Sequence, residues 1–504
     1  MKGTTMNGTL SSQAADATPT LEREFDLIVI GAGSGGVRCA RIAASLGARV
    51  AIVERAHWGG TCVNLGCVPK KLMFYGVQVG KAIADGPAYG WDVTLPQHSW
   101  PDFKRSKDRV IERLDGIYVR LLENAGVALF RGDAALAGPR AGGGWRVEVG
   151  PSPLAPERPV TVIGAARVVV ATGSSPTRLA IPGADLALTS DQVFTMDDCP
   201  ASMLVLGAGY IGVEFSGVFA GFGVKTSLAF RRDHVLRGFD SQMVGRLEEL
   251  MAQAGVTLYP GLEPVRIERA SSGAGLVTHF ANGTELEAGG VLMATGRHPA
   301  VAGLNLESAG VALERGRIVT NARFETSVPG IYAIGDVTNH INLTPVAVAE
   351  GQMLAETLYG PGPRDQRDFK AVPKAVFFQE PLSTVGISED EALADGGNYA
   401  IFTSSFTPLS QSVPQRPGQA LMKLIVKAGR SPDGALAGSG AIVGVHMVGE
   451  DSPDIIQVMA MAVVNQMTKA QLDRVLALHP TMAEEFVTMR APQRFISAGK
   501  VVAD

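Results

Sequence analysis

Two stretches of the chain repeat one order of elements: an apolar strand, a glycine-rich turn and a helix. In the first, Phe25–Ile30 is apolar except at Asp26, Gly31–Gly36 opens a helix predicted to run through Leu46, and Arg49–Glu54 is a second strand ending in an acid. Apolar strands alternating with a helical segment are typical of a parallel βαβ unit. The pattern therefore predicts a dinucleotide-binding α/β fold in this part of the chain.

A second copy begins at the strand Met203–Leu206. The turn Gly207–Gly212 follows it, then a helix reaching about Gly221 and the strand Val224–Phe230. In both copies the first glycine allows a tight turn, the second lets the backbone approach a pyrophosphate, and the third lets the helix pack closely on the strand. An incidental glycine loop is the alternative, but the flanking strands and helices favour two nucleotide sites.

The two units differ at the end of their second strand. Glu54 is placed to bind ribose hydroxyls in the first unit. Arg231 and Arg232 replace the acid in the second unit, and Arg237 follows shortly after. Arginine here can pair with a 2′-phosphate, so we expect the second nucleotide to be NADPH. The alternative is that these arginines only solvate a loop.

The rest of the chain supplies landmarks and a change of pattern. Two β-rich stretches end in Ala171-Thr172-Gly173 and Ala294-Thr295-Gly296, and a strand after Pro329 ends at Gly335-Asp336. From Val372 onward the pattern changes to short strands and one helix, predicted at Ala420–Val426, Ala441–Val448 and Pro453–Asn465. We expect a separate C-terminal domain.

Composition excludes several classes of protein. The 504 residues exceed one hydrophobic core and predict three or four domains. A formal net charge of −4 argues against a nucleic-acid partner, and we find no uncharged apolar run of membrane-spanning length. Met1–Glu24 is rich in small polar residues without an apolar run, so we expect a disordered extension, no secretory signal and a cytoplasmic protein.

Two of the four cysteines, Cys62 and Cys67, lie five residues apart. In a regular helix this step rises about 7.5 Å and turns the side chains roughly 140° apart, whereas disulfide-bonded Cα atoms are about 5.5 Å apart. A redox disulfide therefore requires a distorted backbone, which Gly66 would allow. A disulfide that closes so short a loop contributes little stability. Its reactivity is therefore the better explanation for a disulfide at this place. Lys70 and Lys71 would favour the thiolate.

The alternatives for this pair are a zinc half-site and two buried thiols. Zinc requires two further ligands at matching spacing, but Cys39 and Cys199 stand alone and no histidine is spaced as a ligand. We therefore predict no metal. Two nucleotide sites and a redox disulfide together indicate electron flow from nicotinamide through flavin to sulfur.

From about Phe25 to Arg490 the chain resembles the class I pyridine nucleotide-disulfide oxidoreductase family, and most closely its members that reduce glutathione disulfide. The resemblance rests on Gly59–Lys71, both glycine loops, Gly335-Asp336, and Leu478–Thr481 with Glu484. It implies two Rossmann-like domains, for FAD and NADPH, and a C-terminal α+β dimerisation domain. The expected division is an extension (1–24), an FAD domain (25–173), an NADPH domain (174–297), a central domain completing the FAD site (298–371) and an interface domain (372–504).

The resemblance also implies roles for individual residues. Cys67 would face the flavin and receive the electrons, and Cys62 would attack the disulfide substrate. Lys70 would lie near flavin N5 and pair with Glu214, and Tyr210 would cover the flavin until nicotinamide displaces it.

By position alone, His479 is an ordinary histidine before a proline turn. In the family context it would protonate the leaving thiolate, and Glu484 would orient its ring. Both would come from the other subunit, so we expect catalysis to require a homodimer.

The nucleotide contacts that the resemblance implies are numerous. For FAD they are Gly31, Gly33, Ser34, Gly36, Glu54, Gly60, Thr61, Cys62, Lys70, Ala171, Thr172, Gly173, Gly335, Asp336, Leu343, Thr344 and Pro345. For NADPH they are Gly207, Gly209, Tyr210, Ile211, Glu214, Arg231, Arg237 and Gly296.

The expected substrate is glutathione disulfide, which is anionic. Arg38 and Arg41, at positions i and i+3, share one face of a helix, whereas a polyamine-conjugated substrate would call for acids there. The resemblance adds Ser34 and Tyr118 to Arg41 as substrate contacts, and the alternative is that the arginines only solvate the helix. The sequence departs from the family at Gln352, where some members have arginine.

A second departure is Gly212, where many NADPH-using members have alanine. The alternative functions are a dihydrolipoamide dehydrogenase or another disulfide reductase of the family, and, outside enzymes, a redox-sensing flavoprotein. Dihydrolipoamide dehydrogenase would favour an acid at Arg231.

Overall fold

The structure is a computed structural model that describes residues 21–271, 273–361, 369–430 and 435–502. The chain divides into two compact units. Of the described residues, unit 1 holds those within 1–58, 118–172 and 301–364, and unit 2 holds those within 59–117, 173–300 and 365–504. Residues 1–20 of the expected extension lie outside the described residues, and the boundaries of the expected domains stay a prediction.

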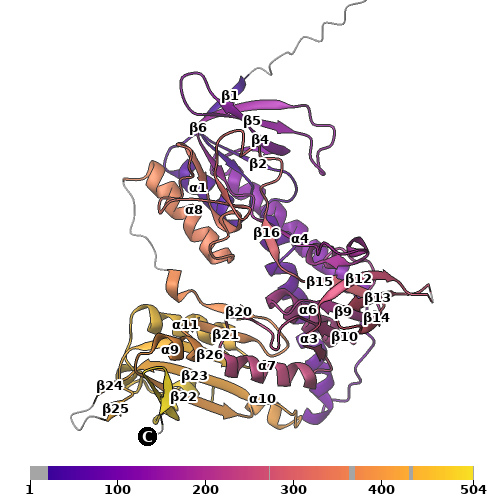
Figure 1. Ribbon diagram of the computed structural model, residues 1–504, viewed down its shortest axis with the longest axis vertical. Coiled ribbons are helices and arrows are strands. Elements are labelled where there is room, and N and C mark those ends of the chain that lie inside the picture. The colour runs from indigo at the N-terminus through magenta and orange to yellow at the C-terminus, as the bar shows by residue number, and fades with distance from the viewer. Residues whose placement is uncertain (1–20, 272, 362–368, 431–434, 503–504) are drawn as a thin grey trace, which may run out of the picture. The chain divides into compact units, whose positions relative to one another are not determined.

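Unit 1 is built on a mixed sheet with the strand order β3-β2-β1-β6-β5-β4, and β19 pairs with β6 (Figure 1). The pairs β3-β2, β2-β1, β1-β6 and β6-β19 are parallel, whereas β5 is antiparallel to both β4 and β6. The strands are β1 (Leu21–Ile30), β2 (Val50–Glu54), β3 (Ala128–Arg131), β4 (Asp133–Pro139), β5 (Trp145–Gly150), β6 (Thr161–Val170) and β19 (Ile331–Ala333). β1 begins four residues before the predicted strand.

Both faces of this sheet are covered, which explains the continuous apolar run Leu27–Ile30 at the end of β1. Leu27 and Val29 belong to one buried cluster, whereas Ile28 and Ile30 belong to another. Helices α1 (Ser34–Ser45) and α8 (Thr344–Tyr359) pack together beside the first cluster (Figure 1). Their approach is so close that a Cβ added at Gly351 would lie 2.4 Å from the carbonyl oxygen of Gly35.

Unit 2 contains a parallel sheet with the order β11-β10-β9-β15-β8, an antiparallel sheet β12-β13-β14, and a C-terminal antiparallel sheet β20-β21-β26-β23-β22-β27-β28. The strands of the first two are β8 (Leu188–Thr189), β9 (Ser202–Leu206), β10 (Lys225–Ala229), β11 (Thr257–Tyr259), β12 (Pro264–Arg269), β13 (Leu276–Phe280), β14 (Glu285–Ala288) and β15 (Gly290–Met293). Those of the C-terminal sheet are β20 (Lys374–Val376), β21 (Leu382–Gly386), β22 (Tyr399–Phe406), β23 (Ala420–Lys427), β26 (Ile442–Val448), β27 (Arg494–Ser497) and β28 (Lys500–Val502).

The longer helices of unit 2 and those that bear on the site are α2 (Gly60–Asn64), α3 (Cys67–Asp85), α6 (Tyr210–Gly221), α7 (Ser241–Gln253), α9 (Glu389–Asp395), α11 (Ser452–Val464) and α13 (Glu484–Thr488). Helix α4 (Trp100–Glu123) has residues in both units. The second βαβ unit and the C-terminal strands and helix lie within two residues of their predicted bounds. The predicted fold class is confirmed, with parallel Rossmann-like sheets and a C-terminal α+β part. No helix among the described residues is long and apolar enough to cross a membrane.

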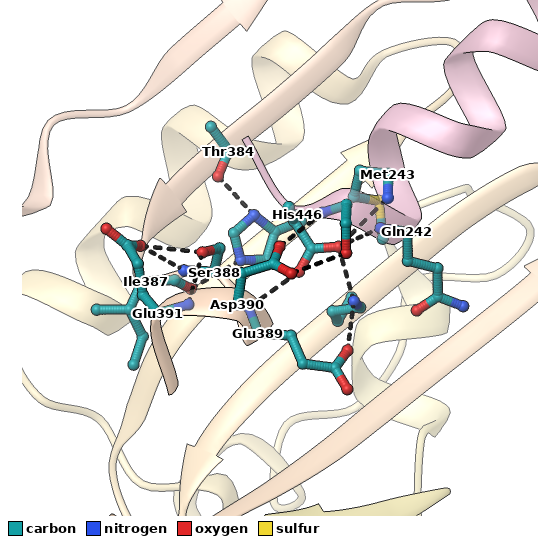
Figure 2. A network of polar contacts seen from close by, with 12 residues as sticks. Gln242, Met243, Thr384, Ile387, Ser388, Glu389, Asp390, Glu391 and His446 are labelled. Carbon is teal, nitrogen blue, oxygen red and sulfur yellow. Dashed lines mark hydrogen bonds and ion pairs between the residues drawn. The ribbon is translucent and has the colours of Figure 1, made fainter. Parts of the chain in front are cut away.

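A buried ionic cluster ties α7 to the C-terminal sheet inside unit 2 (Figure 2). Lys423 of β23 is fully buried, and its Nζ lies 2.7 Å from Asp240 Oδ1 and 2.7 Å from Glu389 Oε2. Arg494 Nη2 lies 2.6 Å from the same oxygen of Glu389. Buried charges are tolerated only when paired and hydrogen-bonded, so this cluster fixes α7 against the sheet.

Candidate functional site

The two cysteines lie on either side of a break between helices. α2 ends at Asn64, Leu65 and Gly66 have non-helical backbone angles, and α3 begins at Cys67. Gly66 has φ −159° and ψ −118°, and a Cβ added there would lie 2.9 Å from the carbonyl oxygen of Thr61. The predicted distortion at Gly66 is therefore confirmed, whereas the disulfide itself stays a prediction.

Cys67 is exposed and is the first residue of α3, whose start the sequence did not predict. The N-terminus of a helix carries a partial positive charge, which stabilises an anion such as a thiolate. Cys62 is half-buried within α2. Lys70 and Lys71 follow Cys67 by three and four residues, so they lie one turn along the same side of the helix. Both the backbone and the side chains thus favour a thiolate here.

Lys70 is locked to α6, the helix that follows the second glycine loop. Its Nζ lies 2.7 Å from Glu214 Oε1, and both side chains are buried. The same oxygen accepts a hydrogen bond from the backbone N–H of Phe377, at 2.9 Å. The structure therefore brings Lys70 and Glu214 together and adds Phe377, which sequence reasoning missed because it is distant in the chain.

In unit 1, three chain segments end at the same edge of the mixed sheet. Parallel neighbours share their carboxyl edge, so the loops after β1, β6 and β19 meet there. The N–H of Ala171 donates to Ile30 O at 2.8 Å, and that of Ile334 donates to Val170 O at 3.1 Å. The residues expected to bind FAD at 31–36, 171–172 and 335–336 thus lie on neighbouring loops, whereas Gly60, Thr61, Cys62, Lys70 and Gly173 belong to unit 2.

Backbone geometry explains the glycines of the first loop. Gly31 has φ +103°, and a Cβ there would lie 2.4 Å from Ala171 O; one at Gly36 would lie 2.0 Å from Gly31 O. Among the described residues, nothing lies within 4 Å of the place a Cβ would take at Gly33, the N-cap of α1. The loop is therefore packed tightly from behind and open at the helix N-terminus, where a pyrophosphate would bind.

Two buried carboxylates support these loops. Glu54 Oε2 accepts from Ala32 N at 2.7 Å, and its Oε1 accepts from Ala56 N at 2.7 Å. Glu350 of α8 accepts from Gly335 N at 2.7 Å. Burial raises the pKa of both carboxyl groups, although these backbone N–H groups oppose the shift. Glu350 was not found from sequence, because its position fits the pattern of an ordinary helix.

The N-terminus of α8 completes this group of loops. Leu343 is its N-cap, Thr344 its first residue and Pro345 its second. Asp336 and Ser34, the first residue of α1, are both half-buried.

The second glycine loop repeats the first. Gly207 has φ +106°, and a Cβ there would lie 2.6 Å from Ala294 O. A Cβ at Gly212 would lie 1.9 Å from Gly207 O, so alanine at this position would force the loop apart. Packing within this loop therefore explains the departure at Gly212. Gly209 is the N-cap of α6 and Tyr210 its first residue, with 47% of Tyr210 exposed.

The arginines expected to select NADPH follow the end of β10. Arg231 and Arg237 are exposed, and Arg231 Nη1 lies 3.5 Å from Glu263 Oε1 in an exposed ion pair. Exposed pairs of this kind contribute little free energy, so Glu263 leaves Arg231 available to a ligand. Gly296, which follows β15 and has φ +115°, belongs to the same unit.

Arg38 and Arg41 lie on α1 of unit 1, and Arg38 contacts the departure at Gln352. Its Nη1 donates to Gln352 Oε1 at 3.1 Å, and Gln352 Nε2 donates to Glu356 Oε1 at 2.6 Å. Among the described residues, the buried Nε of Arg41 has no hydrogen-bond acceptor. Tyr118 of α4 is half-buried and packs against the cluster beside α1.

His479 and Glu484 come together as the resemblance implied. His479 Nδ1 lies 3.1 Å from Glu484 Oε2, and the ring is 80% exposed whereas the carboxylate is mostly buried. Glu484 is fixed at the start of α13, where Oε1 also accepts from Thr481 N at 3.4 Å. A carboxylate on Nδ1 fixes the orientation of the ring, which is the arrangement that the expected role in proton transfer requires.

Among the described residues, no group of three or more His, Cys, Asp or Glu side chains is arranged to hold a metal ion.

Comparisons with known proteins show the family that the chain is similar to. The family model described as pyridine nucleotide-disulphide oxidoreductase matches residues 25–351, and that of its dimerisation domain matches residues 372–490. A glutathione reductase of Burkholderia cepacia is 42% identical over 93% of this chain and 98% of its own. The chloroplastic/mitochondrial glutathione reductase of Pisum sativum is 37% identical over 95% of this chain and 84% of its own, and a trypanothione reductase of Leishmania donovani is 34% identical over 96% and 99%.

Proposed function

Because the chain belongs to the pyridine nucleotide-disulphide oxidoreductase family, we propose that it reduces glutathione disulfide to two glutathiones with NADPH, through FAD and a Cys62–Cys67 disulfide. One observation carries the proposal. The helix that begins at Cys67 is joined by Lys70 to Glu214, on the helix of the second glycine loop. A reactive sulfur and a nucleotide-binding helix are thereby coupled inside one unit.

The residues present fit FAD. The loop at Gly31–Gly36 leaves open space at Gly33 and offers the N-terminus of α1 to a pyrophosphate. Glu54 and Glu350 hold this loop and the one at Gly335 in place. FAD, when bound, supplies the two-electron chemistry that links a nicotinamide to sulfur.

The chain's own residues perform the thiol steps. With both cysteines reduced, the Cys62 thiolate attacks one sulfur of glutathione disulfide, and a mixed disulfide forms while one glutathione thiolate leaves. His479 of the partner subunit protonates that leaving thiolate. The Cys67 thiolate then attacks the Cys62 sulfur, which releases the second glutathione and re-forms the Cys62–Cys67 bond. A hydride equivalent from NADPH, which supplies two electrons and one proton, and one proton from water would then restore both thiols.

Charge supports glutathione disulfide as the substrate. The neutral amide of Gln352 separates Arg38 from Glu356. A carboxylate bonded directly to Arg38 would neutralise it, whereas the amide orients the guanidinium and leaves its charge to attract an anion. Arg41 adds a second cation on the same helix face.

The match to dimerisation-domain sequences supports a homodimer, in which His479 and Glu484 of one subunit would serve the other. The exposed His479 ring fits such a role, because a proton donor to another subunit's substrate must face outward. We also propose a cytoplasmic location.

The test is a substrate panel on the purified protein with both nicotinamide cofactors. We expect rapid oxidation of NADPH with glutathione disulfide, slow oxidation of NADH, and no turnover of lipoamide. Arg38→Glu should raise the KM for glutathione disulfide, whereas Arg49→Glu, a surface change elsewhere in unit 1, should not. A preference for lipoamide with NADH, or for trypanothione disulfide, would overturn the assignment.

A further inference from the structure

The ring of Phe377 lies close to both of the lysines that follow Cys67. Lys70 Nζ is 3.8 Å and Lys71 Nζ is 3.9 Å from its centroid. Phe377 follows β20 in the chain, so this contact joins the C-terminal sheet to α3 within unit 2. Its backbone N–H also holds Glu214, the acceptor of Lys70.

The two lysines have different partners. Lys70 is paired with a carboxylate, so its charge is largely compensated locally. Lys71 is bordered by aromatic rings, with its Nζ 4.5 Å from the centroid of Phe74 and 4.9 Å from that of Tyr75. An aromatic face attracts an ammonium group without cancelling its charge.

The charge of Lys71 needs such support. Burial lowers the pKa of Lys71 and the neighbouring Lys70 lowers it further, whereas Asp454 of α11 and Glu214 of α6 act in the opposite sense. Lys71 is also one helical turn from Cys67. Among the described residues, Lys71 is therefore the cation closest in sequence to this sulfur that has no carboxylate within ion-pair distance.

We propose that Phe377 is a positioning residue, which holds Lys71 charged and in place so that its field stabilises the thiolate of Cys67. The inference rests on the proposed function only in taking Cys67 as a reactive sulfur. Phe377, which is distant from Cys67 in sequence, would then control the fraction of Cys67 that is thiolate at a given pH.

The test measures the alkylation of Cys67 by iodoacetamide as a function of pH in the holoenzyme, after chemical reduction and with peptide mass spectrometry as the readout. Phe377→Leu removes the ring face at similar size and should move the alkylation midpoint upward by roughly half a pH unit to one unit, a three- to tenfold slower reaction below the midpoint. Phe377→Trp should restore the midpoint.

Two further variants separate positioning from a purely structural effect. Phe378→Leu removes the neighbouring, fully buried ring, which belongs to the hydrophobic core, and should lower the melting temperature without moving the midpoint. Lys71→Met should move the midpoint as Phe377→Leu does, and the double variant should add nothing. An unchanged midpoint in Phe377→Leu, or additive shifts in the double variant, would overturn the proposal.

The assay does not use glutathione disulfide. If the proposed substrate is wrong, Phe377→Leu should still shift the alkylation midpoint of Cys67. If the proposed role of Phe377 is wrong, Phe377→Leu and the wild type should have the same midpoint.

Discussion

Replacing Lys423 by methionine should destabilise the contact between α7 and the C-terminal sheet. Methionine keeps most of the apolar stem, so packing changes little, but the cation that lies between Asp240 and Glu389 is lost. Glu389 keeps Arg494 as its partner. The penalty therefore falls on Asp240, the N-cap of α7, which would keep only backbone donors such as those of Gln242 and Met243.

The expected magnitude follows from burial. Lys423 and Asp240 side chains are both 0% exposed. Removing one partner of a buried ion pair costs about 3–5 kcal/mol, because the other charge stays buried and uncompensated. If this free energy is lost from the local opening of α7 and β23, the amides of these elements should exchange roughly a hundredfold to a few thousandfold faster. Replacing Asp240 by asparagine in the same chain should recover a large part of the loss.

The effect should depend on pH. Burial alone would raise the pKa of Asp240, but Lys423, His446 and hydrogen bonds hold it below its ordinary value. The wild-type contribution is therefore present above pH ~4 and is lost as pH falls further. Without Lys423, burial dominates and the pKa of Asp240 rises. Protonation then relieves the penalty, so the difference between variant and wild type should shrink as pH falls from 7 toward 5.

Protonation of His446 should also reduce the penalty in the Lys423→Met variant as pH falls. Burial lowers its pKa, so the ring is neutral in the wild type at neutral pH. Its Nε2 faces the carbonyl of Ile387 and therefore carries the proton, and Nδ1 accepts from Thr384 (Figure 2). Lys423 contributes to the lowered pKa. Its loss should let His446 take up a proton more readily at mildly acidic pH, which again reduces the penalty.

The assay is native-state hydrogen exchange followed by mass spectrometry, read on peptides that cover α7 and β23. Lys427→Met, at the exposed end of the same strand, is the matched control and should exchange like the wild type. Exchange in Lys423→Met that rises less than tenfold, or a difference that does not shrink at lower pH, would refute this account of the cluster.

Three other predictions concern the chemistry. Cys62→Ser should keep FAD and its reduction by NADPH in rapid-mixing experiments but lose disulfide turnover, and full residual turnover would mean the sulfur roles are misassigned. His479→Ala should lower turnover roughly 10²- to 10⁴-fold. Glu484→Gln should lower it less, because the amide oxygen can still accept a hydrogen bond from the ring. Losses of turnover that are equal in the two variants across the pH–rate profile would contradict an orienting role for Glu484. Arg237→Ala should raise the KM for NADPH about tenfold or more and leave that for NADH unchanged; equal changes with both cofactors would assign the 2′-phosphate elsewhere.

Much of the fold followed from local pattern. Both βαβ units have period and glycine spacing that depend only on neighbouring residues, and the helix break at Gly66 followed from the geometry of two cysteines five residues apart. The start of α3 at Cys67 did not follow, because no capping residue marks it: Gly66 is the N-cap and offers no side-chain hydrogen bond.

The supporting contacts of the site were beyond sequence reasoning because their partners are distant in the chain. Phe377 meets Glu214 from 163 residues away, and Glu350 sits within a helix whose pattern gives no sign of a buried acid. Lys423 did leave a signal, since it interrupts the apolar strand Ala420–Lys427. A lysine flanked by apolar residues at the centre of a strand predicts a buried ion pair, but not its partners.

The central claim is that electrons pass from NADPH to Cys62 and Cys67 and on to glutathione disulfide, and thiol mapping tests it most directly. In anaerobic samples of the holoenzyme, one equivalent of NADPH should make both cysteines available to alkylation, and glutathione disulfide added before the alkylating agent should protect both again. Cys39 and Cys199 serve as internal controls, because burial raises the pKa of each to about 12. Cysteines 62 and 67 that stay unlabelled after NADPH, or that stay labelled after glutathione disulfide, would contradict the account.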